Sequence, residues 1–204
     1  AAFVYEDQVY YNVGLRYRGE SSRWREPHAY RINFPSPQHF QGMQRLNLVG
    51  DHLSREALTY DLFQRAGMAA SDTEFVDLYI NGAYQALYLT IEQVDEAFLA
   101  AHFPEDDKGN LYRAKDGGDL AYRGPDPDAY RTYYLKKTNE GEDDFSDIIA
   151  LTDALTNSPG EVLQVSAEAL ADMAQWTRWF ALNALVFNTE GALFVGQGDD
   201  YFLY

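Results

Sequence analysis

The clearest pattern of hydrophobic and polar positions lies between residue 75 and Glu92, where it predicts a β-hairpin. Every second position is apolar on both sides of Asn81-Gly82: Val76, Leu78 and Ile80 before it, and Leu87, Leu89 and Ile91 after it. Asn and Gly tolerate the positive φ angles of a type I′ turn, so the chain is expected to reverse there. Glu92 then ends the second strand on the face of Tyr88 and Thr90.

The rest of the pattern predicts strands first and helices later. Alternation favours strands at 4–18, 30–34, 111–113, 133–137 and 200–204, and residues 40–48 are predicted to form a turn that leads into a third short strand. Apolar residues at helical spacing favour helices between Asp51 and Gly67, at 95–103 from a cap at Asp95, at 143–155, and from a cap at Ser166 to residue 185. This order predicts an α+β fold, with a sheet-rich part at 1–139 and a helical part at 140–204 of one domain.

Composition narrows the class of protein. A chain of 204 residues with 46% hydrophobic residues is large enough for one domain with its own core. A net charge of −16 argues against a nucleic-acid partner, and no apolar run is long enough to cross a bilayer. The absence of cysteine excludes disulfides and thiolate chemistry, and the four histidines show no metal-ligand spacing. The first residue is Ala1 and the last, Tyr204, falls in a predicted strand, so we expect a piece of a longer protein.

An early turn has the residue types that bind a polyphosphate. Arg16 and Arg18 precede Gly19, and the hydroxyls of Ser21 and Ser22 follow. Guanidinium groups, hydroxyls and the backbone N–H groups of a glycine turn all donate hydrogen bonds to phosphate oxygens. An ordinary β-turn with solvated arginines explains the same residues, and one glycine does not separate the two interpretations.

Two further groups of charged residues could belong to a phosphate-transfer site. A cation on the phosphates and a carboxylate that positions it are expected among Arg31, Glu92, Lys115, Lys136 and Lys137. Glu190 and Asp200 follow the last predicted helix and could act as general base and metal ligand. The alternative for both groups is that these residues are solvated surface charges. This alternative fits Glu92 least well, because Glu92 ends an apolar strand.

Together these segments resemble the spore coat protein H (CotH) family of atypical protein kinases. The resemblance covers nearly the whole chain, through residues 14–22, 30–34, 40–48, 65–67, 79–84, 87–95, 110–113 and 137–139. It implies a divergent two-lobed protein-kinase-like fold, ATP with Mg²⁺ or Mn²⁺, and phosphate transfer to protein hydroxyls, usually serine.

The resemblance also implies roles for particular residues. The segment from Arg16 to Ser22 would lie over the nucleotide phosphates. Glu92 would hold a phosphate-binding cation, either Arg31 or Lys137. Glu190 would stand at the position of the catalytic base and Asp200 at that of a metal-binding asparagine.

The chain departs from the family pattern at positions that matter for chemistry. Glu190 stands where Asp is expected, and displacing a reacting group by roughly 1 Å can cost about a hundredfold in rate. Asp200 stands where Asn is expected, and Arg18 where Lys is common. The family's metal-binding Asp belongs to a later strand and has no counterpart before Tyr204, so the domain is expected to be truncated at its C-terminal end.

Three functions remain open from the sequence. The leading one is a protein kinase whose acidic surface suits a basic, serine-containing protein substrate. The second is a kinase-like enzyme that transfers a nucleotidyl or another group, because fold does not fix chemistry. The third is a non-catalytic surface or assembly module with a decayed site. The sequence assigns no compartment; a secreted or cell-surface location is one expectation.

Overall fold

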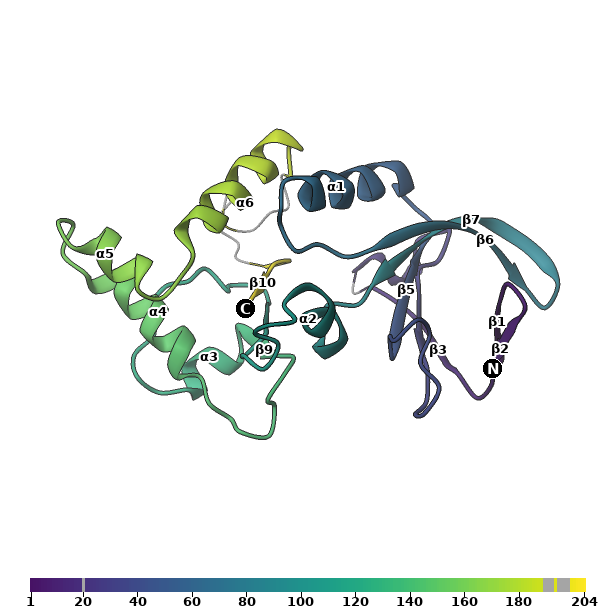
Figure 1. Ribbon diagram of the computed structural model, residues 1–204, viewed down its shortest axis with the longest axis horizontal. Coiled ribbons are helices and arrows are strands. Elements are labelled where there is room, and N and C mark those ends of the chain that lie inside the picture. Colours follow the sequence, from purple (N-terminus) through teal and green to yellow (C-terminus); the bar gives the residue numbers. More distant parts are fainter. Residues whose placement is uncertain (20, 189–192, 194–198) are drawn as a thin grey trace. The chain divides into compact units, whose positions relative to one another are not determined.

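The computed structural model describes residues 1–19, 21–188, 193 and 199–204, and it is mixed α/β (Figure 1). The chain divides into two compact units, residues 1–107 and 108–204. Most strands lie in the first unit and most helices in the second, which confirms the predicted order of a sheet-rich part followed by helices.

The first unit is built on a five-stranded antiparallel sheet with the strand order β3-β4-β5-β7-β6. Its strands are β3 (Gly14–Tyr17), β4 (Tyr30–Asn33), β5 (Arg45–Val49), β6 (Thr73–Ile80) and β7 (Ala83–Glu92). The strands predicted at 30–34 and 40–48 are therefore confirmed as β4 and β5.

The single strand predicted at 4–18 is wrong. The segment forms a separate hairpin, β1 (Phe3–Tyr5) and β2 (Gln8–Tyr10), before β3 begins. Glu6 and Asn12 have φ angles of 50° and 58°, which turn the chain between these strands. Alternation continues across both turns, so the pattern alone does not reveal them.

The hairpin of β6 and β7 matches its prediction closely. Asn81 and Gly82 have φ angles of 52° and 80°, as a type I′ turn requires. In the register of the pair, Val76 lies opposite Tyr88 and Glu74 opposite Thr90. Glu92 is two residues beyond Thr90, so it shares that face of the sheet.

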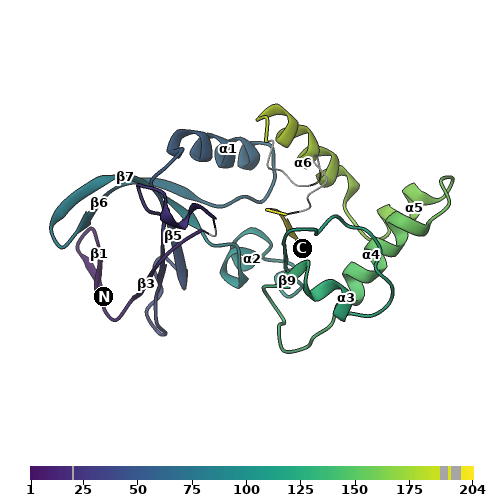
Figure 2. The ribbon, with the colours of Figure 1, turned by 180° about the vertical axis from the view of Figure 1, so that it is seen from behind.

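Helix α1 (Leu53–Arg65) covers one face of the sheet, and it lies alongside β6 and β7 in both views (Figures 1 and 2). Strand residues Val49, Leu89 and Ile91 form the buried cluster against which α1 packs. The opposite face packs on an aromatic cluster with the β1–β2 hairpin, formed by Tyr10, Val13, Ile32, Phe34, Phe40, Leu46, Leu48 and Tyr88.

The ends of the helices in the first unit are set by local chemistry. Asp51 was expected to cap α1, but its carboxylate accepts from the backbone N–H of His52, which precedes the helix in a left-handed conformation. Gly67 has a φ of 75° just after α1, as predicted. Asp95 caps α2 (Glu96–His102) as predicted, because its carboxylate accepts from the Ala97 N–H at 3.1 Å.

The second unit combines a small sheet with four helices among its described residues. The sheet has the order β10-β8-β9, with β8 (Tyr112–Ala114), β9 (Tyr134–Lys136) and β10 (Phe202–Leu203). The helices are α3 (Asp128–Arg131), α4 (Ser146–Asn157), α5 (Leu163–Glu168) and α6 (Met173–Leu185). The strands near 111–113, 133–137 and 200–204 and the helix near 143–155 are thus confirmed.

The long helix predicted from Ser166 to residue 185 is wrong, because the segment forms two helices. Ser166 lies inside α5 instead of capping it. Asp172 accepts hydrogen bonds from the N–H groups of Ala174 and Gln175 at 3.0 Å, and this cap starts α6 as a separate helix.

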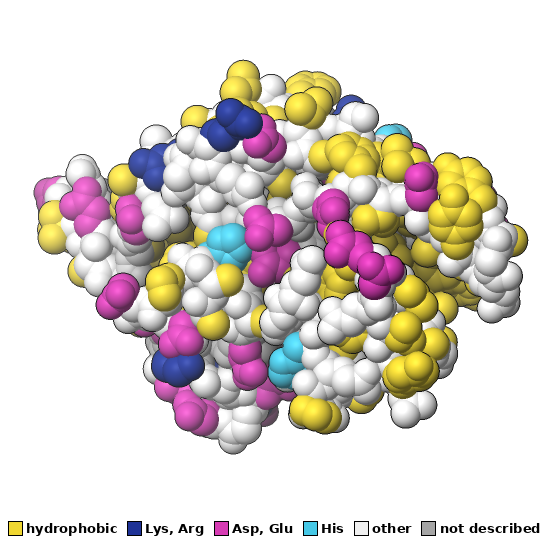
Figure 3. All heavy atoms as spheres, turned by 45° about the vertical axis from the view of Figure 1, so that its right-hand side comes forward, with side chains coloured by type: hydrophobic (Ala, Val, Ile, Leu, Met, Phe, Trp, Pro, Cys, Tyr) yellow, Lys and Arg dark blue, Asp and Glu magenta, His cyan; other side chains and the backbone are white. Residues whose placement is uncertain are grey.

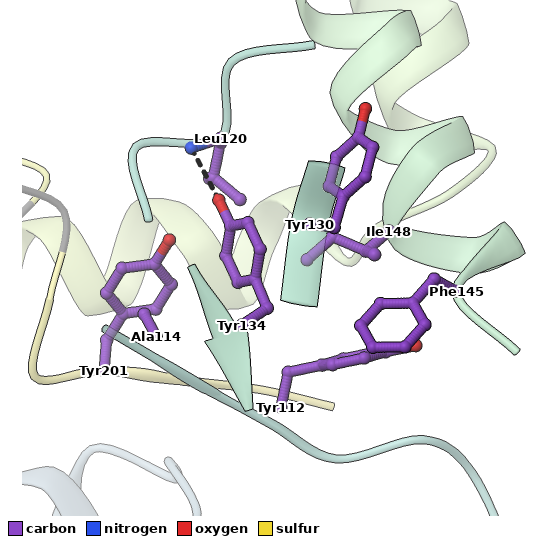
Figure 4. Close-up of a cluster of buried hydrophobic side chains, with 8 residues drawn as sticks. All are labelled: Tyr112, Ala114, Leu120, Tyr130, Tyr134, Phe145, Ile148 and Tyr201. Atoms are coloured by element: carbon purple, nitrogen blue, oxygen red, sulfur yellow. Dashed lines mark hydrogen bonds between the residues drawn. The ribbon is translucent and has the colours of Figure 1, made fainter. Parts of the chain in front are cut away.

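Tyrosines dominate the core of the second unit (Figure 4). Tyr134 is almost fully buried, and its hydroxyl accepts from the Leu120 N–H at 2.8 Å. The hydroxyl of Tyr112 donates to Asp147 at 2.6 Å, and that of Tyr201 to the Gly118 carbonyl. Burial raises the pKa of both Tyr112 and Tyr201. Each ring is therefore anchored by a polar partner at its buried end.

In the part of the chain that the structure describes, none of the helices combines the length and apolar character needed to span a membrane.

Candidate functional site

The turn after β3 has a backbone shape suited to its glycine. Gly19 has a φ of 105°, a conformation that residues with a Cβ rarely adopt. A short 3₁₀ helix, η1 (Ser21–Trp24), follows, and Arg23 Nε donates to the Gly19 carbonyl at 3.2 Å. The side chains of Ser21 and Ser22 lie outside the described part of the structure, so their contacts with phosphate stay predictions.

Arg31 lies in a network of buried amides. In the sheet register it stands between Arg16 on β3 and Asn47 on β5, so these three side chains share one face. Arg31 Nε donates to Asn47 Oδ1 at 3.0 Å, and Arg31 Nη2 donates to Gln93 Oε1 at 2.6 Å. Asn47 and Gln93 are buried and neutral. These two hydrogen bonds orient the guanidinium.

Arg18 lies within electrostatic reach of α1. Burial raises the pKa of Glu56, and the positive charge of Arg18 acts against this shift. Burial and the negative charge of Glu56 also raise the pKa of Tyr60, and the positive charge of Arg18 again acts against this shift. α1 covers the face that carries Arg31, because Ile91 shares that face in the register and belongs to the cluster on which Tyr60 packs. We call it the α1 face.

Glu92 lies on the opposite face and has other partners. Its Oε2 is 2.9 Å from His102 Nε2 and accepts from the Asp72 backbone N–H at 3.2 Å. Glu92 is the residue after Ile91, and successive residues of a strand point to opposite faces. The structure therefore does not bring Glu92 together with Arg31, although both were expected at the same phosphate site.

A hollow of about 190 Å³ opens beside Glu92. Its lining combines acidic, hydroxyl and apolar side chains: Phe40, Gln41, Met43, Leu46, Asp72, Thr73, Glu74, Thr90 and Glu92. We call it the acidic hollow, because three carboxyl-bearing residues border it. Acidic side chains are also spread over the face of the molecule shown in Figure 3, where few basic side chains are visible. A cation is favoured over an anion in such a setting.

The remaining predicted residues belong to the second unit. Lys137 directly follows β9, and its backbone N–H donates to the Leu111 carbonyl at 2.8 Å. Asp200 is exposed just before β10, and its Oδ1 lies 3.5 Å from Arg113 Nη2. Glu190, the predicted catalytic base, lies outside the described residues, so its role stays a prediction.

Sequence reasoning missed several residues of both faces. Asn47 could have been found, because a lone amide in an otherwise apolar buried strand demands hydrogen-bond partners. Glu56 carries no such signal, since a glutamate in the first turn of a helix is ordinary. His102 and Asp72 lie ten and twenty residues from Glu92 on other segments. Only the folded chain shows that they meet.

Comparison with known proteins places the chain in a family. The sequence profile described as CotH kinase protein matches residues 15–204, so the chain belongs to this family. Among curated proteins, it is 26% identical over 190 residues to the inner spore coat protein H of Bacillus subtilis strain 168. The match covers 88% of this chain but 51% of that protein, so the chain spans about half the length of this relative.

Proposed function

We propose that this chain is a protein kinase domain that uses ATP and a divalent metal ion to phosphorylate protein hydroxyls, with serine as the preferred acceptor. The α1 face of the sheet is the observation that carries the proposal. It holds an oriented guanidinium, Arg31, beside Arg16, and an arginine, Arg18, near the helix glutamate Glu56. Oriented cations are the main requirement for binding the phosphates of ATP.

The order of elements supports a kinase-like arrangement. In protein kinases a cation on the third strand pairs with a glutamate on the helix that follows it. Here α1 likewise follows the third strand of the sheet, β5, and precedes the β6–β7 hairpin. The third strand carries Arg45, which lies 3.5 Å from Asp95, and Asn47, to which Arg31 donates from β4. In this proposal, Arg18 is the cation that Glu56 holds in position.

The proposed reaction needs few groups from the protein. The serine Oγ bonds to the γ-phosphorus, the bond from that phosphorus to the bridging oxygen of ADP breaks, and the hydroxyl proton passes to Glu190. Arg16, Arg18 and Arg31 would bind phosphate oxygens, together with the turn around Gly19 and the hydroxyls of Ser21 and Ser22. Glu92 is left out of this set, because its carboxylate lies on the other face.

Asp200 and Lys137 complete the proposed set. Mg²⁺ or Mn²⁺ takes oxygen ligands, and Mg²⁺ usually binds one or two protein carboxylates besides the substrate phosphates. The exposed carboxylate of Asp200 suits this donor set. When bound, the ion would neutralise charge on the phosphates. Lys137 is a further candidate for a phosphate contact.

Phosphate transfer is tested with the full-length protein, γ-labelled ATP, Mg²⁺ or Mn²⁺, and a peptide rich in Ser, Arg and Lys. We expect label on the peptide, and a loss of about a hundredfold or more in rate for Glu190→Ala, as for other general bases. Glu168→Ala, which changes an exposed glutamate on α5, is the matched control. Transfer that is unaffected by Glu190→Ala would contradict the assigned role, and no transfer by the wild type would contradict the kinase.

A non-catalytic assembly module is the second candidate. The relative is by name an inner spore coat protein, and Glu190 and Asp200 depart from the family pattern. The β6–β7 hairpin also exposes Phe75, Tyr79 and Tyr84, and exposed aromatic side chains are typical of protein–protein interfaces. A secreted or coat location would suit this role. Calorimetry with ATP and Mg²⁺ separates the candidates, because a decayed module should bind no nucleotide.

The third candidate is a nucleotidyl transferase, which would bind ATP at the same site but cleave a different bond of it. Intact-protein mass spectrometry of the substrate distinguishes the products, because an added phosphate and an added nucleotidyl group differ in mass. The kinase proposal expects the mass of phosphate alone.

A further inference from the structure

Three side chains of types that bind metal ions meet beside the acidic hollow. Asp72, Glu92 and His102 each offer one ligand atom, and these atoms lie within 4.8 Å of one another. They come from separate segments: Asp72 precedes β6, Glu92 ends β7, and His102 ends α2. One imidazole nitrogen with two carboxylate oxygens is a donor set that suits Zn²⁺ and neighbouring divalent transition metals.

The surrounding contacts hold these ligands in place. Gln64 Nε2 donates to Asp72 Oδ1 at 2.8 Å. The Asp72 N–H donates to Glu92 Oε2 at 3.2 Å, and the His102 ring lies against the Phe98 ring with centroids 4.1 Å apart. Outer contacts of this kind orient metal ligands and tune their affinity.

The cluster is buried but reachable. The Glu92 side chain is 7% exposed and that of His102 is 19% exposed, so a bound ion would be largely shielded from solvent. Asp72 is exposed, and both Asp72 and Glu92 border the acidic hollow, which supplies an entry path. Glu74 also borders it and adds negative charge. Local negative charge favours a cation at this place, and the entry path allows it to bind.

We propose that Asp72, Glu92 and His102 bind a divalent transition-metal ion, best of all Zn²⁺, which ties the end of α2 to the end of β7. The proposal does not depend on kinase activity, because the cluster lies on the face opposite to Arg31. Mg²⁺ is disfavoured, since it takes oxygen ligands. A solvent molecule would complete four-coordination.

Binding requires only small shifts. Zinc–ligand bonds of about 2.0–2.2 Å place the donor atoms of a tetrahedral site roughly 3.3 Å apart. Glu92 Oε2 and His102 Nε2, now 2.9 Å apart, would separate slightly, while the Asp72 carboxylate would approach. His102 Nε2 must present its lone pair to the ion, so the neutral imidazole would carry its proton on Nδ1 in the metal-bound form.

The test is calorimetric titration of the metal-free full-length protein with Zn²⁺, with the visible absorption of Co²⁺ as a reporter of tetrahedral geometry. We expect Zn²⁺ binding that Mg²⁺ does not displace, and a loss of more than about tenfold in affinity for His102→Gln. His52→Gln is the matched control, because His52 Nε2 lies 3.4 Å from Asp51 in an exposed pair that no third ligand joins among the described residues. It should bind Zn²⁺ like the wild type.

A second variant keeps the test decisive if His102→Gln fails to fold. Asp72→Asn changes an exposed side chain and should fold, yet it should weaken Zn²⁺ binding by more than about tenfold. A wild type that binds no Zn²⁺ would overturn the proposal. Zn²⁺ binding that is unchanged in Asp72→Asn would also overturn it. Neither outcome bears on phosphate transfer, so the two proposals fail separately.

Discussion

Adjacent residues at the end of β7 serve opposite faces of one sheet. Gln93 accepts from Arg31 on the α1 face, whereas Glu92 contacts His102 on the other face. The α1 face gathers guanidinium groups, and the other gathers carboxylates beside the acidic hollow. The alternation of a strand thus lets a single Glu-Gln pair separate the surface proposed to bind ATP from the cluster proposed to bind a metal ion.

The largest expected effect tests how the α1 face is built. Leu89 is fully buried under α1, whereas Leu87, two residues earlier on the same face, is 44% exposed. Leu89→Ala should lower the free energy of unfolding by about 2–5 kcal/mol. Leu87→Ala is the matched control and should cost far less. Urea denaturation measures both, and equal losses would mean that α1 does not cover Leu89.

Removing the side-chain amide of Asn47 should weaken ligand binding on the α1 face and leave the opposite face unaffected. Asn47→Ala leaves Arg31 Nε without its described partner, and an unpaired buried polar group costs about 1–3 kcal/mol. We also expect weaker binding of ATP with Mg²⁺, because the guanidinium loses its orientation, and unchanged binding of Zn²⁺. Asn157→Ala, at an exposed position at the end of α4, is the control. Zn²⁺ affinity that falls with Asn47→Ala would show that the faces are not independent.

The complementary change acts on the other face. Asp95→Ala removes the cap of α2 and should cost about 1 kcal/mol of stability. Because α2 carries His102 at its last turn, Zn²⁺ binding should weaken while ATP binding stays the same. Denaturation and the two calorimetric titrations check this. An unchanged Zn²⁺ affinity would contradict the expectation that the cap at Asp95 helps to position His102 at the other end of α2.

The smallest expected effect concerns pH and Glu56. Burial raises its pKa above the ordinary 4.5, so the folded state binds the proton more tightly than the unfolded state. Stability from this group is therefore present below the ordinary pKa and lost as the pH rises through the raised folded pKa. Glu56→Gln removes that loss. Its stability relative to the wild type should increase as the pH rises from about 4 through the raised pKa of Glu56, measured by urea midpoints. A constant difference would contradict the burial of Glu56.

Local patterns predicted the parts of the fold that depend on neighbours in sequence. Alternation and Asn81-Gly82 were enough for the β6–β7 hairpin and for the face of Glu92. The split between α5 and α6 was missed, because Asp172 fits equally well as a polar helix residue until its carboxylate is seen to cap α6. Hydrophobic periodicity does not distinguish one long helix from two in register.

The site was less predictable than the fold. Arg31 was singled out from its charge, but its partners Asn47 and Gln93 lie on other strands and depend on register. Glu92 was predicted to lie on the phosphate side, but its carboxylate lies on the face opposite to Arg31. Which face a residue takes follows from alternation. Which charged side chain contacts it on that face depends on the tertiary structure, as the contact between His102 and Glu92 shows.

The most direct test measures two affinities in two variants of the full-length protein, with Arg65→Gln, at an exposed position of α1, as a common control. Arg31→Gln should weaken the binding of ATP with Mg²⁺ by more than about tenfold and leave Zn²⁺ binding unchanged. His102→Gln should do the reverse. Arg31→Gln with undiminished ATP affinity, or two variants that lose both ligands together, would contradict a sheet whose opposite faces bind different ligands.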